Sequence, residues 1–321
     1  MNNISPVPWP WVRGLVSLGI LAGLLALLDA GEIFRRLGSM QAGWVLVALV
    51  LSVVQVVISA WRWRFTAAHL GVDFGMGLAI REYYLASFLN QVLPGGVTGD
   101  VSRAWRQARS RSGAQQTPGP AVRAVVLERA SGQMVMGAAA LASVFVLPSD
   151  VRGPMWIWVA GTASLALVLG SWIRRRARRT AAVTAPRSHF GRLMHDARTA
   201  VLGPRVLPLQ IASSLVVVGT YIATYLVAAR AVGLTTGWAE LAPLVAPVLM
   251  VMLVPISVAG WGLREGAAAL LWSAAGLTTA EGVAVSVAYG LIVLLSTLPG
   301  LAVLLASLLR RSGSSSQVEV E

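Results

Sequence analysis

The chain has 321 residues, of which 56% are apolar and 12% are charged, and its mean hydropathy is +0.71. Soluble domains carry roughly twice that charged fraction, so the composition indicates an integral membrane protein and excludes an ordinary soluble domain. All 26 basic residues are arginine and outnumber the 13 acidic residues, which gives a net charge of +13.

The distribution of the arginines favours lipid over nucleic acid as the partner. They concentrate between apolar runs, where positive charge meets anionic head groups and follows the positive-inside rule. The chain contains no cysteine, which excludes disulfides and thiol chemistry. Its histidines (His69, His189 and His195) lie outside the apolar runs, and no His-Glu-x-x-His pattern occurs. We therefore expect no metal site, no other cofactor and no nucleic-acid partner.

Apolar runs of about 20 residues are long enough to cross the hydrocarbon core as helices. The first such run, residues 11–28, lacks a small-x-small cleavage site and is predicted to be a retained span. A short polar link then leads to a second span at residues 44–65. That span ends on Trp-Arg-Trp-Arg at residues 61–64, and this alternation is typical of an anchor at the head-group layer.

Helix breakers then interrupt the pattern within residues 77–109. Pro94, Gly95 and Gly96 separate two arms, each of which is too short to span the membrane comfortably. Non-helical backbone at membrane depth is tolerated only where it is buried in protein or lines a wet cavity. The segment is therefore predicted to be a re-entrant helical hairpin, followed by a loop at residues 110–120.

A basic segment at residues 174–205 carries nine arginines against one acid. We interpret it as a topology signal that lies on anionic lipid, with a docking site for a partner protein as the alternative. A second interrupted element at residues 239–275 is broken at Pro255 and predicted to be a second re-entrant hairpin. Residues 312–321 are predicted to be a disordered tail. The remaining apolar runs predict spans at residues 122–147, 154–173, 206–229 and 283–309.

The two breaks share one pattern. Residues 94–103 and 255–264 both read Pro-x-x-Val-x-Gly-x-x-x-Arg, at an offset of 255 − 94 = 161 residues. Interrupted segments in matching halves are the best sequence pointer to a transport site. The arginines predict that the basic segment and both termini are cytoplasmic, so residues 11–147 and 154–309 would form an inverted-topology repeat. The sequence thus predicts a single all-α polytopic membrane domain, residues 1–321, with about six transmembrane helices plus two re-entrant helical hairpins.

Several charged residues lie within or beside apolar segments, where ionisable groups are costly and face the protein interior or water. Asp100 and Arg103 are three residues apart and share a helix face, which predicts an ion pair. Arg264 and Glu265 are adjacent, so the sequence predicts a separate partner for each, with Glu128 a candidate for Arg264. An ion-pair network that only holds the two hairpins together is the alternative to a binding role.

An anion-binding role follows from the expected helix ends. Gly99 and Gly260 are predicted to open outgoing arms, whose free N–H groups and positive dipole ends favour an anion. Arg103 and Arg264 add planar charged groups suited to phosphate, and lipid phosphate is the anion available at that depth. Asp100 has a second interpretation as an N-terminal helix cap. The predicted lipid-phosphate site comprises Gly99, Asp100, Arg103, Glu128, Arg129, Gly260, Arg264 and Glu265.

Three ordered blocks resemble a known family. Residues 90–104 read Asn-Gln-Val-Leu-Pro-Gly-Gly-Val-Thr-Gly-Asp-Val-Ser-Arg-Ala and look like the hallmark of the lysylphosphatidylglycerol synthase transmembrane-region family, also called flippase-like. Residues 127–129 and 255–266 fit its other two blocks, so the resemblance covers nearly the whole chain. The chain departs from the family at Tyr289 and Gly290, where family members often carry Tyr-Arg. This chain therefore lacks the arginine that would supply a second basic contact near its end.

The resemblance implies the lipid-translocating region of such proteins without the cytosolic domain that makes the lipid. We therefore expect a transporter that moves an anionic-headed lipid between the leaflets of the bacterial cytoplasmic membrane. The lipid classes that fit are a phospholipid, an aminoacyl-phospholipid and a polyprenyl phosphate. The alternatives are a non-transporting membrane partner of a lipid-synthesis enzyme, and an aminoacyl or glycosyl transferase. The absence of a soluble domain and of a nucleophile–base pair argues against the transferase.

Overall fold

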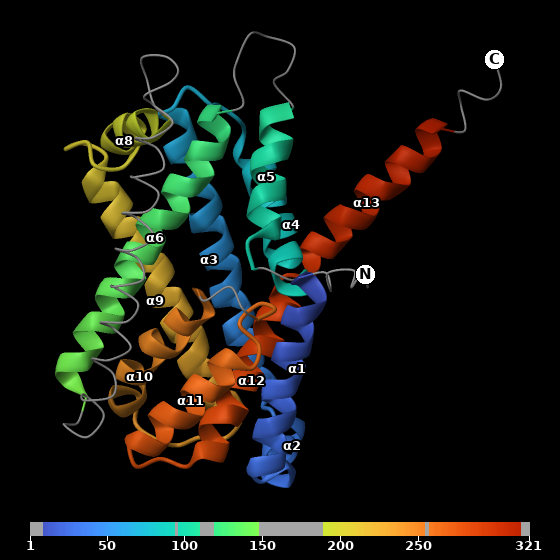
Figure 1. Ribbon diagram of the computed structural model, residues 1–321, viewed down its shortest axis with the longest axis vertical. Coiled ribbons are helices and arrows are strands. Elements are labelled where there is room, and N and C mark those ends of the chain that lie inside the picture. The colour runs from blue at the N-terminus through green and yellow to red at the C-terminus, as the bar shows by residue number, and fades with distance from the viewer. Residues whose placement is uncertain (1–8, 94–95, 110–118, 148–188, 254–256, 316–321) are drawn as a thin grey trace, which may run out of the picture.

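The computed structural model describes residues 9–93, 96–109, 119–147, 189–253 and 257–315, and all regular elements in these ranges are helices. Long helices run side by side along the molecule, and shorter helices gather at its two ends (Figure 1). The prediction of an all-α fold is confirmed. The predicted span at residues 154–173 lies outside the described residues, as do Pro94, Gly95 and Pro255.

Four helical runs in the described part of the chain are long and apolar enough to cross a membrane. They coincide with four predicted spans, and the chain is therefore a multi-pass membrane protein. The last run continues as helix through Ser315, so residues 312–315 are helical although the sequence assigned them to a disordered tail. The four runs are α3 (Ala42–Ala68), α6 (Gly119–Val146), α9 (Leu207–Ala231) and Thr279–Leu309, which joins α12 (Thr279–Ser296) to α13 (Leu298–Ser315).

The N-terminal span is followed by a sharp bend. Helices α1 (Trp9–Leu27) and α2 (Ala30–Gly38) meet at 104° and together would provide a fifth crossing. The polar link that we predicted between the first two spans is helical, because most of it forms α2. Asp29 caps α2 by accepting a hydrogen bond from a backbone N–H at 3.0 Å. Helix α2 packs on α12, where Arg36 reaches Glu281 at 2.9 Å.

Each interrupted segment consists of two helices that pack against each other. The helix breakers predicted an interruption in each segment, and neither segment is one continuous helix. The two helix pairs occupy opposite ends of the bundle (Figure 1). The first pair is α4 (Met76–Val92) and α5 (Thr98–Arg109); the second is α10 (Trp238–Met250), extended by the 3-10 turn η1 (Val251–Leu253), and α11 (Leu263–Ala274).

Glycines determine the backbone at both breaks. Gly96 has a φ of 63° and Gly260 a φ of 81°, a left-handed conformation that glycine adopts without strain. Helix α11 begins only at Leu263, whereas we predicted that Gly260 opens it. A Cβ added at Gly99 would lie 1.9 Å from the carbonyl oxygen of Ala86. Only glycine therefore allows α5 to pack this closely on α4.

The three long helices α3, α6 and α9 pack on one another and form the centre of the bundle. Helix α8 (His189–Ala200) lies against α6, where Arg123 and Asp196 form an ion pair. Helix α8 therefore forms part of the basic segment at residues 174–205. The part of that segment before His189 lies outside the described residues.

Candidate functional site

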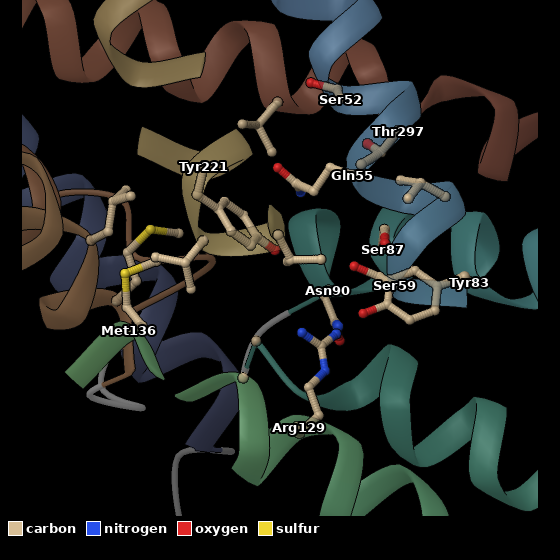
Figure 2. A pocket seen from close by; sticks show the side chains of 18 of the residues that line it. Ser52, Gln55, Ser59, Tyr83, Ser87, Asn90, Arg129, Met136, Tyr221 and Thr297 are labelled. Carbon is tan, nitrogen blue, oxygen red and sulfur yellow. The ribbon is translucent and has the colours of Figure 1, made fainter. Parts of the chain in front are cut away.

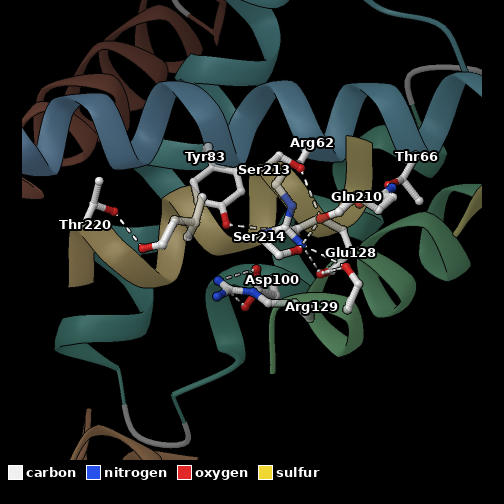
Figure 3. Close-up of polar contacts among 12 residues, drawn as sticks. Arg62, Thr66, Tyr83, Asp100, Glu128, Arg129, Gln210, Ser213, Ser214 and Thr220 are labelled. Atoms are coloured by element: carbon white, nitrogen blue, oxygen red, sulfur yellow. Dashed lines mark hydrogen bonds and ion pairs between the residues drawn. The ribbon is translucent and has the colours of Figure 1, made fainter. Parts of the chain in front are cut away.

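Asp100 belongs to a buried charge cluster, and Figure 3 shows it next to Arg129. It is 7% exposed and accepts hydrogen bonds from Arg103 Nη2 at 3.0 Å and Asn90 Nδ2 at 3.0 Å, while Arg129 Nη2 lies 2.8 Å from Oδ2. The predicted pair of Asp100 and Arg103 is confirmed. Asn90 Oδ1 also accepts a hydrogen bond from the N–H of Gly99 at 2.7 Å. The capping oxygen at the start of α5 therefore comes from Asn90, and not from Asp100, which is the third residue of that helix.

Glu128 on α6 is the second acid of this cluster and is 2% exposed. Its carboxylate accepts hydrogen bonds from Arg103 Nη2 at 3.3 Å and from the Tyr83 hydroxyl at 3.4 Å. It lies 4.0 Å from Arg62 Nη1, and Arg62 Nη2 donates to Ser131 Oγ at 2.8 Å. These contacts connect α3, α4 and α5 to α6 through one carboxylate.

We predicted that residues 61–64 form an interfacial anchor, and this prediction is wrong for two of the four residues. Arg62 and Trp63 are 2% and 1% exposed, because this side of α3 packs on α4 and α6. The Arg103 guanidinium lies 4.4 Å from the centre of the Trp63 ring and 4.5 Å from that of Tyr83. Two aromatic faces therefore stabilise the buried charge of Arg103 through cation–π contacts.

The cluster carries more positive than negative charge. Arg62, Arg103 and Arg129 face Asp100 and Glu128, which leaves a formal charge of 3 − 2 = +1. Among the described residues, the Nε atoms of these three arginines have no hydrogen-bond partner. The side chain of Arg103 is fully buried, whereas that of Arg129 is 32% exposed. Arg129 is therefore the arginine through which the excess charge can reach a ligand.

Arg129 lines a cavity of about 230 Å³ inside the bundle, which we call the polar chamber. Figure 2 shows the side chains of Tyr83 and Tyr221 entering it from opposite sides, with Arg129 and Asn90 next to each other at its edge. Arg62 and Glu128 are the other charged residues in the described lining. Hydroxyl and amide groups supply much of the rest, among them Ser52, Gln55, Ser59, Ser87, Gln133 and Thr297.

A second cavity of about 510 Å³, which we call the apolar groove, adjoins the polar chamber. Arg129 and Gln133 line both cavities. Gly96 from the first break and Met252 and Ala259 from the second also line both. Both breaks therefore contribute residues to the region where the polar chamber adjoins the apolar groove. Five apolar side chains of the groove are 42% to 64% exposed: Val97, Val101, Trp105, Val122 and Val126.

Arg264 and Glu265 form a second buried cluster, which is neutral. Arg264 Nη2 lies 2.6 Å from Glu265 Oε1, and both side chains bond to Ser286 Oγ, at 2.9 Å and 3.0 Å. The prediction of a separate partner for each, with Glu128 for Arg264, is wrong. The arginine side chain is long enough to fold back onto the neighbouring carboxylate, and Glu128 is engaged by Arg103.

A family model described as the lysylphosphatidylglycerol synthase TM region matches residues 11–300 of the chain. The chain belongs to this family. The resemblance of the three sequence blocks is thereby confirmed. No curated protein and no solved structure matches the chain.

In this member of the lysylphosphatidylglycerol synthase TM-region family, the eight residues predicted to form a lipid-phosphate site fall into three groups. Glu128 and Arg129 line the polar chamber, and Arg129 also lines the groove. Asp100 and Gly260 line only the groove. Residues outside the lining of both cavities are Gly99, Arg103, Arg264 and Glu265. Within the described residues no group of three or more His, Asp or Glu side chains is arranged to hold a metal ion.

Gly290, where the chain departs from the family pattern, packs closely against Arg264 and Trp261. A Cβ added at Gly290 would lie 2.3 Å from Arg264 Nη2 and 2.6 Å from the ring of Trp261. Arg264 therefore occupies the space in which a side chain at residue 290 would begin. Its guanidinium also lies 5.2 Å from the centre of the Tyr289 ring.

Helix α1 contacts the second break directly. The N–H of Val258 donates a hydrogen bond to Ser17 Oγ at 2.9 Å. A Cβ added at Gly262 would lie 2.9 Å from Ile20 Cβ. The N-terminal helix therefore covers the backbone that precedes α11.

Sequence reasoning missed three residues of the site: Arg62, Tyr83 and Asn90. Asn90 is the first residue of the block that resembles the family hallmark, and this position was the available signal. Arg62 belonged to a pattern that is typical of interfacial anchors, which concealed its burial. Glu82 belongs to a separate group of charges, in which it pairs with Arg81 at 3.2 Å and with Arg106 at 2.6 Å.

Proposed function

We propose that this protein moves a lipid with an anionic head group between the two leaflets of a membrane. The observation that carries this proposal is the junction at Arg129, where an arginine with excess positive charge separates a polar chamber from an apolar groove. A lipid phosphate at this arginine has its head group in the chamber and its acyl chains in the groove. Arginine suits this position because its planar guanidinium stays charged and can donate two parallel hydrogen bonds to phosphate.

The proposed architecture is an inverted repeat with about six spans, in which α4–α5 and α10–α11 are re-entrant hairpins. Three observations support it: the shared pattern at the two breaks, the opposite ends of the bundle that the two pairs occupy, and the cavities that both breaks line. Transporters built this way bind substrate between the repeats and expose the site to each side in turn. We propose that the protein lies in the bacterial cytoplasmic membrane with both termini in the cytoplasm.

Within this proposal, Arg129 contacts the phosphate in the conformation described here. Arg103 pairs with Glu128 in the first half. Arg264, at the matching position of the shared sequence pattern, pairs with Glu265 in the second half. Each is paired with an acid, so each becomes available to a phosphate only in a conformation that opens its ion pair. Arg103 and Arg264 are thus proposed ligands of a later step in the transport cycle.

The proposal is tested by lipid movement in vesicles that contain only the purified protein. We expect an anionic lipid to cross the membrane faster in vesicles with wild-type protein than in vesicles without protein. Arg129→Ala should reduce this rate at least about tenfold. Arg129→Lys should reduce it less, because lysine keeps the charge but loses the planar geometry. Arg35→Ala is the matched control, since Arg35 is 75% exposed on α2 and lines neither cavity.

Two results would count against this function. Wild-type protein that moves no lipid above the empty-vesicle rate favours the alternative of a non-transporting partner of a lipid-synthesis enzyme. A full rate for Arg129→Ala removes the junction from the mechanism.

For Arg103 and Arg264, both Ala and Lys variants are measured for stability and transport together. Lost transport in a stable protein supports a phosphate contact, whereas activity that falls in step with folding supports only a structural role.

A further inference from the structure

We propose that a small inorganic anion such as chloride binds in the polar chamber beside Arg62. This inference goes beyond the proposed function, because it concerns an ion that stays with the protein whether or not a lipid is moved. Three observations support it: a buried arginine with a weak contact to its acid, an open space next to that arginine, and a neighbouring hydroxyl that is available to donate.

Arg62 has the weakest acid contact of the three arginines around Asp100 and Glu128. Arg129 lies 2.8 Å from Asp100, and Arg103 donates to Glu128 at 3.3 Å. Arg62 approaches Glu128 only to 4.0 Å, although its side chain is 2% exposed (Figure 3). A buried charge without close compensation is costly. An anion beside Arg62 would therefore stabilise this arrangement.

Arg62 also leaves hydrogen-bonding capacity unused. Its Nη2 donates to the backbone carbonyl of Glu128 at 3.2 Å and to Ser131 Oγ at 2.8 Å. Its Nη1 lies 4.0 Å from the carboxylate of Glu128, which is too far for a hydrogen bond. Among the described residues, Nε has no partner either. A guanidinium carries only donors and keeps its charge, so these N–H groups require an acceptor.

Gly132 on α6 leaves the space beside Nη1 open. A Cβ added at Gly132 would lie 3.4 Å from Arg62 Nη1 and 3.5 Å from Nη2. Arg62 and Gly132 both line the polar chamber. The chamber therefore adjoins the guanidinium at a position where α6 carries no side chain.

Ser59 supplies a hydroxyl on the same side of α3. It precedes Arg62 by three residues, which places both on one face of the helix. It lines the chamber, where Figure 2 shows it next to Tyr83. The hydroxyl of Ser52 donates to the carbonyl of Ala48 at 2.9 Å, whereas that of Ser59 donates to no described residue. Its proton is therefore available to an anion.

The chamber has room for an ion together with water. Its volume of about 230 Å³ far exceeds the roughly 10–15 Å³ that a cavity needs to hold one water molecule. Water can accept hydrogen bonds from the unused N–H groups, but it leaves the positive charge uncompensated. A monovalent anion does both. Glu128, the acid of the described lining, is engaged by Arg103, which weakens its repulsion of such an ion.

The first experiment measures chloride binding to wild-type protein in a neutral detergent. The melting temperature is recorded as sodium chloride replaces sodium gluconate, so that ionic strength and screening stay constant. We expect the melting temperature to rise by at least about 2 °C and then to level off, as for a saturable site. Equilibrium dialysis with radioactive chloride should detect the same saturable site, and bromide should compete for it.

Two glycine variants on α6 test the position of the ion. Gly132→Ala places a methyl group 3.4 Å from Arg62 Nη1, an ordinary contact distance, so it covers the open space and keeps the fold. We expect it to lower chloride affinity at least about tenfold, because the ion loses a hydrogen bond from a charged donor. Gly137→Ala is the matched control. Its Cβ would lie 3.9 Å from Met250 Cε, and Gly137 lines neither cavity, so chloride affinity should stay at the wild-type value.

A general effect of salt would give a different result. A melting temperature that rises without levelling off, or that rises equally in wild type and Gly132→Ala, would overturn the site. Arg62→Gln removes the charge and should abolish saturable binding of chloride. Saturable binding that persists in Arg62→Gln would show that the ion lies elsewhere and would also overturn the inference.

A last comparison separates this ion from a lipid phosphate and from lipid transport. Added phosphatidylglycerol should leave chloride binding unchanged. Competition between the two would assign the site to the lipid phosphate and refute a separate ion. Vesicles in which no lipid moves would refute the proposed function, while saturable chloride binding that depends on Arg62 and Gly132 would still support this inference.

Discussion

Loss of the carboxylate of Glu265 tests how much the second charge cluster contributes to stability. Glu265 is fully buried and bonds to Arg264, to Ser286 and, through Oε2, to the N–H of Gly262 at 2.7 Å. The substitution Glu265→Gln keeps the shape and leaves an oxygen for the Gly262 N–H. It removes the negative charge, so Arg264, at 1% exposure, becomes a buried and unpaired cation.

The expected magnitude follows from burial. Breaking a buried ion pair by removing one partner costs about 3–5 kcal/mol, because the other charge stays in a low dielectric without compensation. Glu281 provides the matched control, since it also pairs with an arginine, Arg36, at 2.9 Å. The two side chains of that pair are 21% and 23% exposed, and an exposed pair contributes about 0.2–1 kcal/mol. Glu265→Gln should therefore cost at least about 2 kcal/mol more than Glu281→Gln.

The measurement is the free energy of unfolding in mixed micelles, followed by circular dichroism as denaturing detergent is added. A third variant, Arg264→Met with Glu265→Gln, removes both charges and should recover much of the loss, because an apolar replacement of a buried pair is often neutral. Equal costs for Glu265→Gln and Glu281→Gln would refute the reasoning. A double variant less stable than Glu265→Gln alone would show that Arg264 contributes through packing and not through its charge.

Three further outcomes are expected. Gly99→Ala should lower the free energy of unfolding by about 1–3 kcal/mol or more, because the new Cβ collides with the backbone of α4. Gly77 has open space around it, so Gly77→Ala should change the free energy of unfolding by less than about 1 kcal/mol. Gly290→Ala should displace Arg264 and lower the melting temperature; an unchanged melting temperature would contradict the close packing seen here. A tag within residues 174–205 should resist a membrane-impermeant reagent in intact cells, and labelling from outside would reverse the proposed orientation.

The long apolar helices and the two breaks were predictable from sequence, because both depend on local chemistry. A run such as α9 is long enough to cross a membrane whatever surrounds it. Proline and glycine interrupt a helix through their own backbone limits, so the breaks near Gly96 and Gly260 did not require knowledge of the fold. The pair of Asp100 and Arg103 was predictable for the same reason, since three residues along a helix place two side chains on one face.

The remaining features depend on what packs against each residue. Arg62 and Trp63 carry the side chains of an interfacial anchor, and only the contact of α3 with α4 and α6 shows that they are buried. Arg264 and Glu265 point in different directions from the backbone, yet the flexible arginine returns to its neighbour because Ser286 accepts from Nε beside it. The choice of Arg129 as the exposed arginine follows from the cavities, which no local pattern encodes.

The contact between helix α1 and the second break affects how the protein can be truncated. An apolar N-terminal helix can be mistaken for a leader or a simple membrane anchor and deleted when the protein is expressed. Here its loss would deprive the N–H of Val258 of Ser17 Oγ and would uncover Gly262, which lies against Ile20. The first helix is thus part of the wall of the second break, and an expression design that deletes it would alter a segment more than 200 residues away along the chain.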